Sequence, residues 1–341
     1  MATSVSPFSP PLDKILHLRY AVFRKHMQKT LVADAPAKIN IGLWVSPYIK
    51  TYPEGNFHEI VSIFKSVPLC DTLTVRFDDA FDTHDTSAEQ NALIVDSDAG
   101  DGNDANLPAD NTLAKAFAAF CAVSGISGAR VNVHVTKRIP QGAGLGGGSS
   151  DAATFLRSLD TFYNTHLTDE QFAKAAAAVG SDVFFFLFGH GLALVGGRGE
   201  KVQPMGAMAD AKGDDAKNGA QHIVLIFPQV HSSTREAYAL VDAWYRENGS
   251  DSAPPSANEM TAVYFGDIRA WNFVNTFALP LMQRFPAIAD ALAALRSAGA
   301  AFVQMSGSGS AVFGVFRSRL DAENAHRVLR NKWQNCYHCS V

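Results

Sequence analysis

Glycine is concentrated in one short segment, Pro140–Asp151, which reads PQGAGLGGGSSD. Glycine permits positive φ angles and close approach of the backbone, so that successive N–H groups can converge on one anion. Apolar residues follow this segment at helical spacing, at Ala152, Phe155, Leu156 and Leu159. The pattern predicts a helix with Ser149 or Ser150 as its N-cap. A glycine loop that opens onto a helix N-terminus predicts a phosphate-binding site.

The common phosphate loops do not fit this segment. A Walker loop ends in Gly-Lys-Ser/Thr, and the segment contains no lysine. The glycines also satisfy the dinucleotide-binding pattern G-x-G-x-x-G, which needs an acid at the end of a second strand about twenty residues later. Asp160 has that distance, but it falls in the continuing helix. The protein-kinase motifs His-Arg-Asp and Asp-Phe-Gly do not occur in the sequence.

Two further segments complete a pattern with this loop. Ala35–Leu43 (APAKINIGL) lies near the N-terminus, and Gln304–Phe313 (QMSGSGSAVF) lies near the C-terminus. With the central GLGGGSS, and in this order, they resemble the three motifs of the GHMP small-molecule kinases, and the resemblance extends from Val32 to Phe316. It implies ATP and Mg²⁺ as cofactors and an α+β fold of two domains. These would be an N-terminal α/β domain like ribosomal protein S5 and a C-terminal ferredoxin-like α+β domain, with the active site in the cleft between them.

Other segments narrow the resemblance to the 4-diphosphocytidyl-2-C-methyl-D-erythritol kinases of this superfamily. They are GNFHEI at 55–60, DTLTV at 71–75, GSDVFFF at 180–186, GRGE at 197–200 and VHSSTREAY at 230–238. The resemblance implies phosphorylation of the 2-hydroxyl of a cytidine diphosphate derivative of methylerythritol, in non-mevalonate isoprenoid precursor synthesis. The sequence departs from the family pattern at the extra residue Asn56, at Phe57 in place of tyrosine, and in two longer loops.

Two alternatives stay open at this point. One is another GHMP kinase, of the homoserine or mevalonate type, which would lack the clamp for a cytosine ring. The other is a catalytically silent nucleotide-binding regulator with the same fold. The retention of both Lys38 and Asp182 counts against the silent regulator.

The resemblance implies a role for each matching residue. Asp182 would accept the proton of the acceptor hydroxyl, and Lys38 would lie between Asp182 and the transferring phosphate. Taken alone, Lys38 reads equally well as a surface lysine and Asp182 as a helix cap. The residues implied to bind ATP are Pro140, Gly142, Ala143, Gly144, Leu145, Gly146, Gly147, Gly148, Ser149, Ser150 and Asn111. Metal ligands are not determined, with Ser149 or Ser150 as candidates.

For the acceptor, an aromatic pair is a natural clamp for a pyrimidine ring. The resemblance implies Phe57 and Tyr238 as this pair, with His58 reading the polar edge of the cytosine. Asn40 and Thr234 would bind hydroxyl or phosphate oxygens. Without the resemblance, Phe57 and Tyr238 are more often core aromatic residues. Gly307 and Gly309 would let a loop pack against the nucleotide site, and His134 is expected to be structural.

Alternating or apolar segments predict the elements that position these residues. Strands are expected at 32–44, 60–64, 71–77, 131–135, 223–227, 301–304 and 310–316, and a helix at 111–123. A long acidic loop at 78–110 contains one strand-like piece at 93–95. The predicted domains are 31–206, which binds ATP, and 220–341, after an N-terminal extension of residues 1–30 that stays outside the fold.

Composition bounds the class of protein. The chain has 341 residues, 47% of them hydrophobic, which suits two domains with cores of their own. The formal net charge of -4 argues against general nucleic-acid or acidic-membrane binding. The apolar run Val183–Phe188 is too short to span a membrane. These features predict a soluble globular protein. The family resemblance implies a cytoplasmic enzyme that binds a small-molecule substrate, as a monomer or homodimer.

The two ends of the chain need separate comment. Residues 14–29 are basic and acid-poor, as in an organelle transit peptide, which would place the protein in a plastid. The alternatives are a plain extension or a true start at Met27. Near the C-terminus, Cys336 and Cys339 have metal-like spacing, but no second ligand pair matches them. Reduced, inert thiols are therefore expected.

Overall fold

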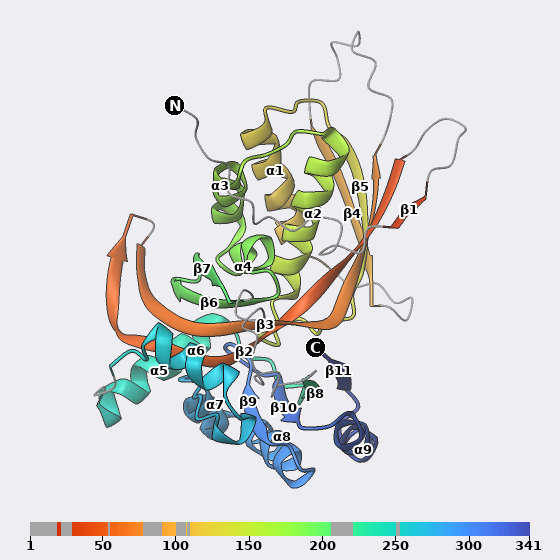
Figure 1. The fold of residues 1–341 in the computed structure, drawn as a ribbon. Helices are drawn as coiled ribbons and strands as arrows, with labels where there is room; N and C mark the ends of the chain where they lie inside the picture. The colour runs from red at the N-terminus through yellow and green to blue at the C-terminus, as the bar shows by residue number, and fades with distance from the viewer. Residues whose placement is uncertain are drawn as a thin grey trace, which may run out of the picture.

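The computed structural model describes residues 30–53, 55–77, 91–99, 107, 110–205, 221–249 and 253–341, together with the backbone of 19–21 and 29. These residues form two sheets with helices packed on them, which confirms the α+β class (Figure 1). The residues between the two predicted domains, 207–219, lie outside the described residues, so the domain bounds at 206 and 220 stay predictions.

The N-terminal part of the described structure has one sheet of seven strands and four helices. Its strands are β1 (Arg19–Ala21), β2 (Lys29–Tyr52), β3 (Gly55–Phe77), β4 (Ala92–Asp98), β5 (Arg130–Thr136), β6 (Leu192–Gly197) and β7 (Lys201–Pro204). The strand order is β1-β2-β3-β5-β4, and β6 joins β3 to β7. The helices are α1 (Thr112–Ser124), α2 (Gly147–Tyr163), α3 (Asp169–Val179) and α4 (Asp182–Phe188). The predicted extension therefore contributes a strand, since β1 pairs with β2.

Strands β2 and β3 are much longer than the sequence pattern predicts. The expected strands at 60–64 and 71–77 are parts of one continuous β3. Its two halves have different neighbours, because β5 pairs with 72–77 and β6 pairs with 60–65. The register of β2 against β3 shifts at Pro36/Ala37, Asn40/Gly42 and Val45/Ile49. Such bulges bend a strand and accommodate proline, so this ribbon can run through both parts of the molecule.

The C-terminal sheet has four antiparallel strands in the order β11-β8-β10-β9. They are β8 (His222–Ile226), β9 (Phe302–Met305), β10 (Val312–Phe316) and β11 (Cys336–Ser340). The helices are α5 (Thr234–Asn248), α6 (Ala257–Phe265), α7 (Ala278–Arg284), α8 (Pro286–Ser297) and α9 (Arg319–Leu329), with a 3₁₀ turn η3 at Ile268–Ala270. In Figure 1 the β2–β3 ribbon runs between these helices and α1–α4.

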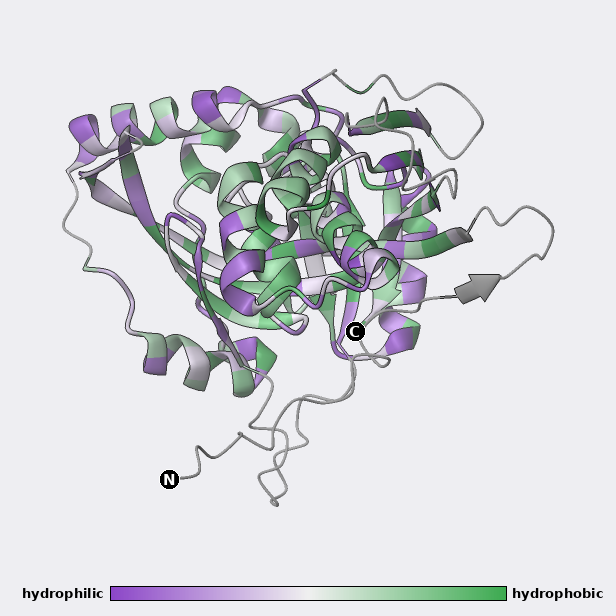
Figure 2. Cartoon of the chain, turned by 90° about the horizontal axis from the view of Figure 1, so that it is seen from above, coloured by the Kyte–Doolittle hydropathy of each residue, from purple (hydrophilic) through white to green (hydrophobic). Residues whose placement is uncertain are grey.

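The hydrophobic cores follow the division of the molecule into an N-terminal and a C-terminal sheet. One apolar cluster lies between the first sheet and α1–α4, and it includes all four residues of the predicted α2 stripe, which are fully buried. A second cluster joins the outer half of the β2–β3 ribbon to α5, α7 and α8, and a third packs under the C-terminal sheet. Figure 2 shows hydrophobic residues gathered in the central elements and hydrophilic ones toward the periphery. The ribbon is thus the common support of both halves.

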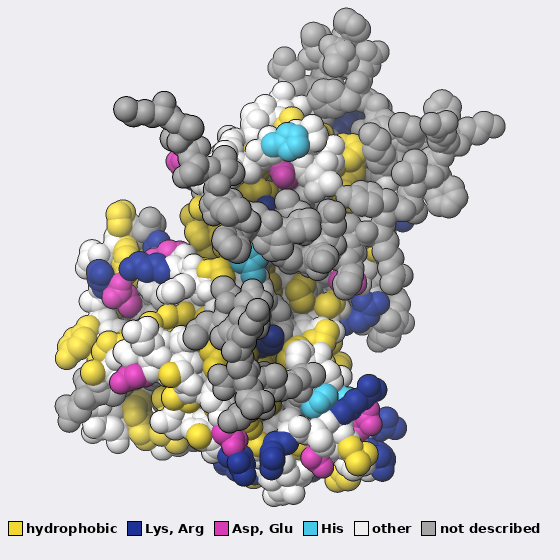
Figure 3. Space-filling model, viewed as in Figure 1, with side chains coloured by type: hydrophobic (Ala, Val, Ile, Leu, Met, Phe, Trp, Pro, Cys, Tyr) yellow, Lys and Arg dark blue, Asp and Glu magenta, His cyan; other side chains and the backbone are white. Residues whose placement is uncertain are grey.

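The described surface is mixed in character. Figure 3 shows Lys and Arg side chains interspersed with Asp and Glu on the face that it presents. Of the helices that the structure describes, none is long and apolar enough to cross a bilayer.

Candidate active site

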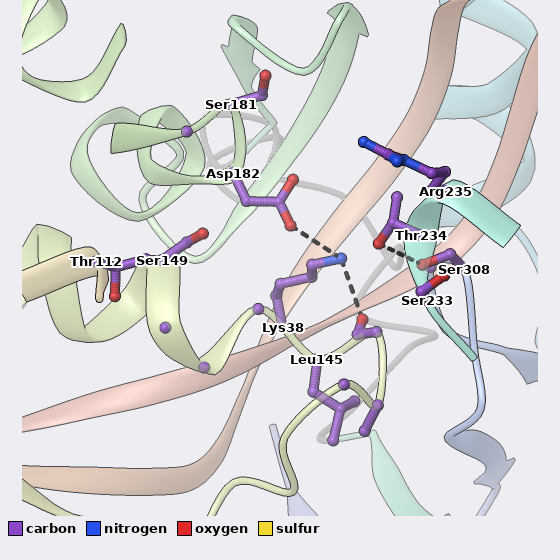
Figure 4. Close-up of a pocket in the computed structure, with 18 of the residues that line it drawn as sticks. Lys38, Thr112, Leu145, Ser149, Ser181, Asp182, Ser233, Thr234, Arg235 and Ser308 are labelled. Atoms are coloured by element: carbon purple, nitrogen blue, oxygen red, sulfur yellow. Dashed lines mark hydrogen bonds and ion pairs between the residues drawn. The ribbon is translucent and has the colours of Figure 1, made fainter. Parts of the chain in front are cut away.

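One cavity, of about 1700 Å³, collects the residues that the sequence singled out. It is lined by β2, β3, the glycine loop, and the starts of α1, α2, α4 and α5. Every predicted catalytic, ATP-binding and acceptor-binding residue lines it except Ser150. Figure 4 shows Ser149 and Thr112 on one side of Lys38 and Asp182, and Thr234, Arg235 and Ser308 on the other.

The glycine loop adopts a backbone that other residues resist. Gly142, Gly144 and Gly146 have φ of 65°, 76° and 72°. Helix α2 begins at Gly147, and its N-cap is Gly146 rather than a serine. The predicted serine cap is therefore wrong, because the chain enters the helix through a left-handed glycine and leaves both serines in the first turn. No side chain caps the first N–H groups of α2, which leaves them to an anion in the cavity.

The C-terminal glycine motif packs on this loop. A Cβ at Gly144 would lie 2.2 Å from the carbonyl oxygen of Ser306, and one at Gly307 would lie 3.0 Å from that of Gly144. The Ser306 hydroxyl donates to the Gly144 carbonyl over 2.9 Å, and Ala311 N–H donates to the Ala143 carbonyl over 3.1 Å. Two motifs far apart in sequence are thus held at backbone contact.

Lys38 is a buried cation on β2, with 3% of its surface exposed. Its Nζ donates to Asn40 Oδ1 over 2.8 Å and to the Gly144 carbonyl over 3.2 Å, and it lies 3.4 Å from Asp182 Oδ2. It also lies 4.6 Å from the centre of the Phe64 ring. Lys38 is therefore not a surface lysine. Its hydrogen-bond partners hold its ammonium group in the cavity wall beside Asp182 (Figure 4).

Asn40 is a buried side chain that accepts a hydrogen bond from Lys38. It is 1% exposed, and its Nδ2 donates to Ser62 Oγ over 2.9 Å while Ser62 donates to the Gly42 carbonyl over 2.6 Å. Both ends of the Asn40 amide are thus engaged within the protein. This geometry makes Asn40 a positioning residue for Lys38.

Asp182 is the first residue of α4, after the N-cap Ser181. Its side chain is 33% exposed, and its carboxylate turns to Lys38 rather than to the helix end. The carboxylate thus has one oxygen beside a buried cation and a surface open to the cavity. It can receive a hydroxyl group from a bound molecule there.

The aromatic residues lie at another part of the cavity wall. The Tyr238 ring stacks on His58 with centroids 5.5 Å apart, and it meets Phe277 edge-on at 4.9 Å. Burial, with a contribution from the charge of Asp182, raises the pKa of Tyr238 to about 12, so its hydroxyl stays protonated. Phe57 is 39% exposed and meets Tyr52 edge-on at 6.2 Å. Phe57 is therefore no core residue.

Both ring nitrogens of His58 face acceptors in the protein. Nδ1 lies 2.7 Å from the carbonyl oxygen of Ser46, and Nε2 lies 3.1 Å from Asp242 Oδ1. Asp242 comes from α5, one turn beyond Tyr238. The ring of His58 is therefore fixed in its plane, with its face on Tyr238 and both its edges occupied.

A buried charge cluster under the glycine loop escaped the sequence reasoning. Lys137 Nζ contacts Asp71 and lies 2.7 Å from Asp151 Oδ2, with all three side chains buried. Asp71 also accepts the N–H groups of Arg138 and Ile139. Desolvation raises the pKa of Asp151 to about 7, against the opposing charge of Lys137. The signal in the sequence was a lysine just before the loop and an aspartate just after it.

These three residues clamp both ends of the glycine loop to β3. Ser150 Oγ and Asp151 Oδ1 are buried and have no hydrogen-bond partner among the described residues. Ser149, in contrast, lines the cavity. The structure therefore favours Ser149 over Ser150 as a group that reaches a ligand.

The remaining sequence candidates lie outside the cavity lining. His134 has the partners that the sequence did not reveal, because its Nε2 lies 2.8 Å from Asp98 Oδ2 and its Nδ1 lies 3.2 Å from Asp96 Oδ2. Cys336 and Cys339 are free and lie three residues apart on β11, so they face opposite sides of the sheet. Burial raises the pKa of each thiol to about 12, which keeps it protonated and unreactive. Across the described ranges, no three His, Cys, Asp or Glu side chains gather as a metal site.

Comparison with known proteins gives consistent results. The family models "GHMP kinases N terminal domain" and "GHMP kinases C terminal" match residues 111–190 and 260–335. The chain is 34% identical over 313 residues to the 4-diphosphocytidyl-2-C-methyl-D-erythritol kinase of Treponema pallidum (strain Nichols), covering 90% of this chain and 97% of that protein. It is 33% identical over 299 residues to the enzyme of that name from Chlorobium luteolum, with 87% and 92% covered.

Solved structures show the same relationship. A crystal structure of 4-(cytidine 5'-diphospho)-2C-methyl-D-erythritol kinase matches with a TM-score of 0.68 at 27% identity, covering 91% of this chain and 98% of that one. A homoserine kinase from Cytophaga hutchinsonii matches with a TM-score of 0.63 at 16% identity, covering 95% and 97%. The second likeness concerns the fold alone.

Proposed function

The chain belongs to the 4-diphosphocytidyl-2-C-methyl-D-erythritol kinase family within the GHMP kinases, and on this basis we propose its reaction and the roles of its residues. It transfers the γ-phosphoryl group of ATP to the 2-hydroxyl of 4-diphosphocytidyl-2-C-methyl-D-erythritol and gives the 2-phosphate, a step of non-mevalonate isoprenoid precursor synthesis. The observation that carries the proposal is the Lys38–Asp182 pair at 3.4 Å, in a cavity that the glycine loop and the aromatic residues Phe57 and Tyr238 also line.

In the proposed transfer step, Asp182 orients the acceptor hydroxyl and accepts its proton as the new O–P bond forms. The bond between the γ-phosphorus and its bridging oxygen breaks, and ADP leaves with that oxygen. Lys38, held by Asn40 and the Gly144 carbonyl, stabilises the charge on the transferred phosphoryl oxygens. Phosphoryl transfer needs such positioning and charge stabilisation more than covalent help.

The glycine loop and the first turn of α2 bind the ATP phosphates in this proposal. Their uncapped N–H groups and the helix dipole favour negative charge. The clamp of Lys137 with Asp71 and Asp151 keeps both ends of the loop in place. Asn111, the N-cap of α1, lines the cavity and is proposed to contact the adenine.

Two oxygen-bearing side chains on the cavity wall are suitable ligands for Mg²⁺. Mg²⁺ usually keeps several waters and binds one or two protein oxygens together with substrate phosphates. The Ser149 hydroxyl and the Asp182 carboxylate are such oxygens on the cavity wall. When bound, the ion neutralises charge on the phosphates. We propose Ser149 and Asp182, rather than Ser150, as the residues that hold it.

Tyr238 and Phe57 bind the cytosine ring of the acceptor, since both line the cavity beside His58. Because Ser46 and Asp242 occupy both edges of the His58 ring, His58 is proposed to fix Tyr238 by stacking rather than to read the base with a ring nitrogen. Thr234, whose hydroxyl lies 3.2 Å from that of Ser308, is proposed to bind hydroxyl or phosphate oxygens of the acceptor.

A coupled assay of ADP release tests the reaction. The purified full chain with ATP, Mg²⁺ and 4-diphosphocytidyl-2-C-methyl-D-erythritol should release ADP only when the acceptor is present. Homoserine and mevalonate, at equal concentration, serve as controls for the other GHMP kinase types. Equal release with either control, or no acceptor-dependent release at all, would refute the proposed substrate.

The reactants are small polar metabolites, and we propose a cytoplasmic site of action. A plastid location requires removal of the basic N-terminal segment. Sequencing the N-terminus of the mature protein from its source distinguishes these locations. Sedimentation of the purified chain decides between monomer and homodimer.

A further inference from the structure

Among the described residues, the charges around the cavity leave one cation unmatched. Five Lys and Arg side chains line it, and four of them meet a carboxylate. Lys38 pairs with Asp182 at 3.4 Å, Lys115 with Asp110 at 3.7 Å, Lys137 with Asp151 at 2.7 Å, and Arg198 with Glu200 at 3.9 Å. The fifth, Arg235, is exposed and makes no ion pair with any carboxylate of the described residues. An unmatched guanidinium in a cavity is suited to an anionic ligand.

Arg235 belongs to a stripe of α5 that faces the cavity. The lining residues of this helix beyond Thr234 are Arg235, Tyr238, Ala239 and Asp242, at i, i+3, i+4 and i+7. On another face, Ala237 and Val241 are buried in the core. The stripe therefore presents a cation, an aromatic ring and a carboxylate in that order, over about 10 Å of helix.

Two positions of this stripe can be matched with parts of the acceptor. The proposed cytosine clamp is at Tyr238, and Asp242 holds His58 beside it. The reacting hydroxyl must lie at Asp182. In the acceptor, a diphosphate separates the cytidine from the methylerythritol. Arg235 lies one turn from Tyr238, next to Thr234 and Ser308, on the side of the stripe away from Asp242.

Its position also separates Arg235 from the proposed ATP phosphates. Figure 4 shows Arg235 extending from α5 over the cavity, on the opposite side of Lys38 and Asp182 from Ser149 and the start of α2. The N–H groups of the glycine loop and of the start of α2, on the opposite side, themselves provide positive potential for the ATP phosphates. Two phosphate environments thus flank the Lys38–Asp182 pair.

We propose that Arg235 binds the diphosphate of the acceptor through its guanidinium group, and that it sets the preference for a cytidine diphosphate over an uncharged acceptor. The proposal rests on the proposed function for the identity of the acceptor. The alternative source of the same chemistry is the phosphate chain of ATP, which the kinetic test separates. A guanidinium group matches phosphate oxygens in a two-pronged manner that an ammonium group does not.

The test compares Arg235→Gln with Arg235→Lys and with the control Arg296→Gln in the full chain. Arg296 is exposed in the last turn of α8 and does not line the cavity, so its substitution changes the net charge equally. We expect Arg235→Gln to raise KM for the acceptor about tenfold and KM for ATP less than about twofold. Arg235→Lys should recover part of the loss, and Arg296→Gln should behave as wild type.

Direct binding separates this proposal from the reaction itself. By calorimetry, Arg235→Gln should weaken binding of CDP and leave binding of cytidine unchanged. Equal losses for both ligands, or a rise in KM for ATP alone, would overturn the proposal. If the wild-type chain fails to phosphorylate the acceptor while CDP binding still depends on Arg235, the proposed reaction fails and the diphosphate subsite stands. An unchanged melting temperature shows that the variant is folded.

Discussion

Nζ of Lys38 lies 3.4 Å from Oδ2 of Asp182, and the two residues reach this position from different elements, β2 and α4. The lysine side chain is 4% exposed and that of the aspartate is 33% exposed. The pair is therefore closed on the side of the protein and open on the side of the cavity. A buried cation stays fixed by Asn40 and Gly144, while the carboxylate can meet a ligand.

The first prediction concerns Asp182. Substitution Asp182→Asn should lower kcat about 10²- to 10⁴-fold, because the amide cannot accept the hydroxyl proton. Binding of ADP in the absence of Mg²⁺ should change little, because the glycine loop is intact. The coupled assay measures kcat, and titration with a fluorescent ADP analogue measures binding. Asp169→Asn, in the first turn of α3 and outside the cavity lining, is the matched control. Full activity of Asp182→Asn would disprove the assigned role.

The second prediction concerns the support of Lys38. Asn40→Ala removes the oxygen that accepts from Lys38 and the amide that donates to Ser62. The free energy of unfolding should fall by about 1 to 3 kcal/mol, because buried partners lose their hydrogen bonds. Assayed well below the melting temperature, kcat should fall with KM for ATP nearly unchanged. Ser62→Ala leaves the Lys38 contact in place and should reduce kcat less. Equal kcat values for the two variants would contradict the positioning role.

The third prediction separates backbone strain from crowding at the loop. Gly144 and Gly125 have almost the same φ, +76° and +74°. A Cβ at Gly144 would meet Ser306 O at 2.2 Å, whereas one at Gly125 would meet nothing within 4 Å. Chemical denaturation should show a loss of about 1 kcal/mol for Gly125→Ala and of about 3 kcal/mol or more for Gly144→Ala. Similar losses in both variants would show that the two motifs are not in backbone contact.

The fourth prediction is a pH dependence of stability from His134. Burial by itself would lower the pKa of His134, but hydrogen bonds and charges from Asp96 and Asp98 outweigh burial and raise it above 6.5. The folded protein therefore holds this proton more tightly than the unfolded chain. The stabilisation is fully present below pH 6.5 and is lost as pH rises through the raised pKa. It should stay below about 1 kcal/mol, because the site is partly exposed.

Denaturation of wild type and His134→Gln across this pH range measures the effect. The difference between the two curves should shrink as pH increases above 6.5. His222→Gln is the control, since His222 lies on a strand and hydrogen-bonds Ser340. A constant difference between wild type and His134→Gln would mean that the carboxylates do not act on the imidazole.

Local features of the chain could be predicted from residue types and spacing alone. Glycines at 142–148 required a special backbone, and the stripe from Ala152 to Leu159 required a buried helix face. Alternation located most strands to within a few residues, as at 131–135 and 223–227. The order of the three motifs indicated the family. These features depend on a residue and its near neighbours, so they do not require knowledge of the fold.

Long-range placement was not readable in the same way. The continuity of β3 through residues 66–70, the clamp of Lys137 on Asp71 and Asp151, and the occupied edges of His58 all depend on partners from distant segments. The serine cap of α2 failed for a related reason, because the loop must pack on Ser306 and enters the helix through Gly146.

The sequence by itself determined that this chain carries an anion loop before a helix, a lysine and an aspartate of catalytic type, and the family to which these belong. The tertiary structure decided which of these groups meet. It placed Lys38 against Asp182, placed Asn40 in contact with the lysine, and left Arg235 without an ion pair to any carboxylate of the described residues. The physical reason is that charge pairing and burial are set by atoms brought together across the fold, whereas backbone preference and helical spacing are set within a few residues.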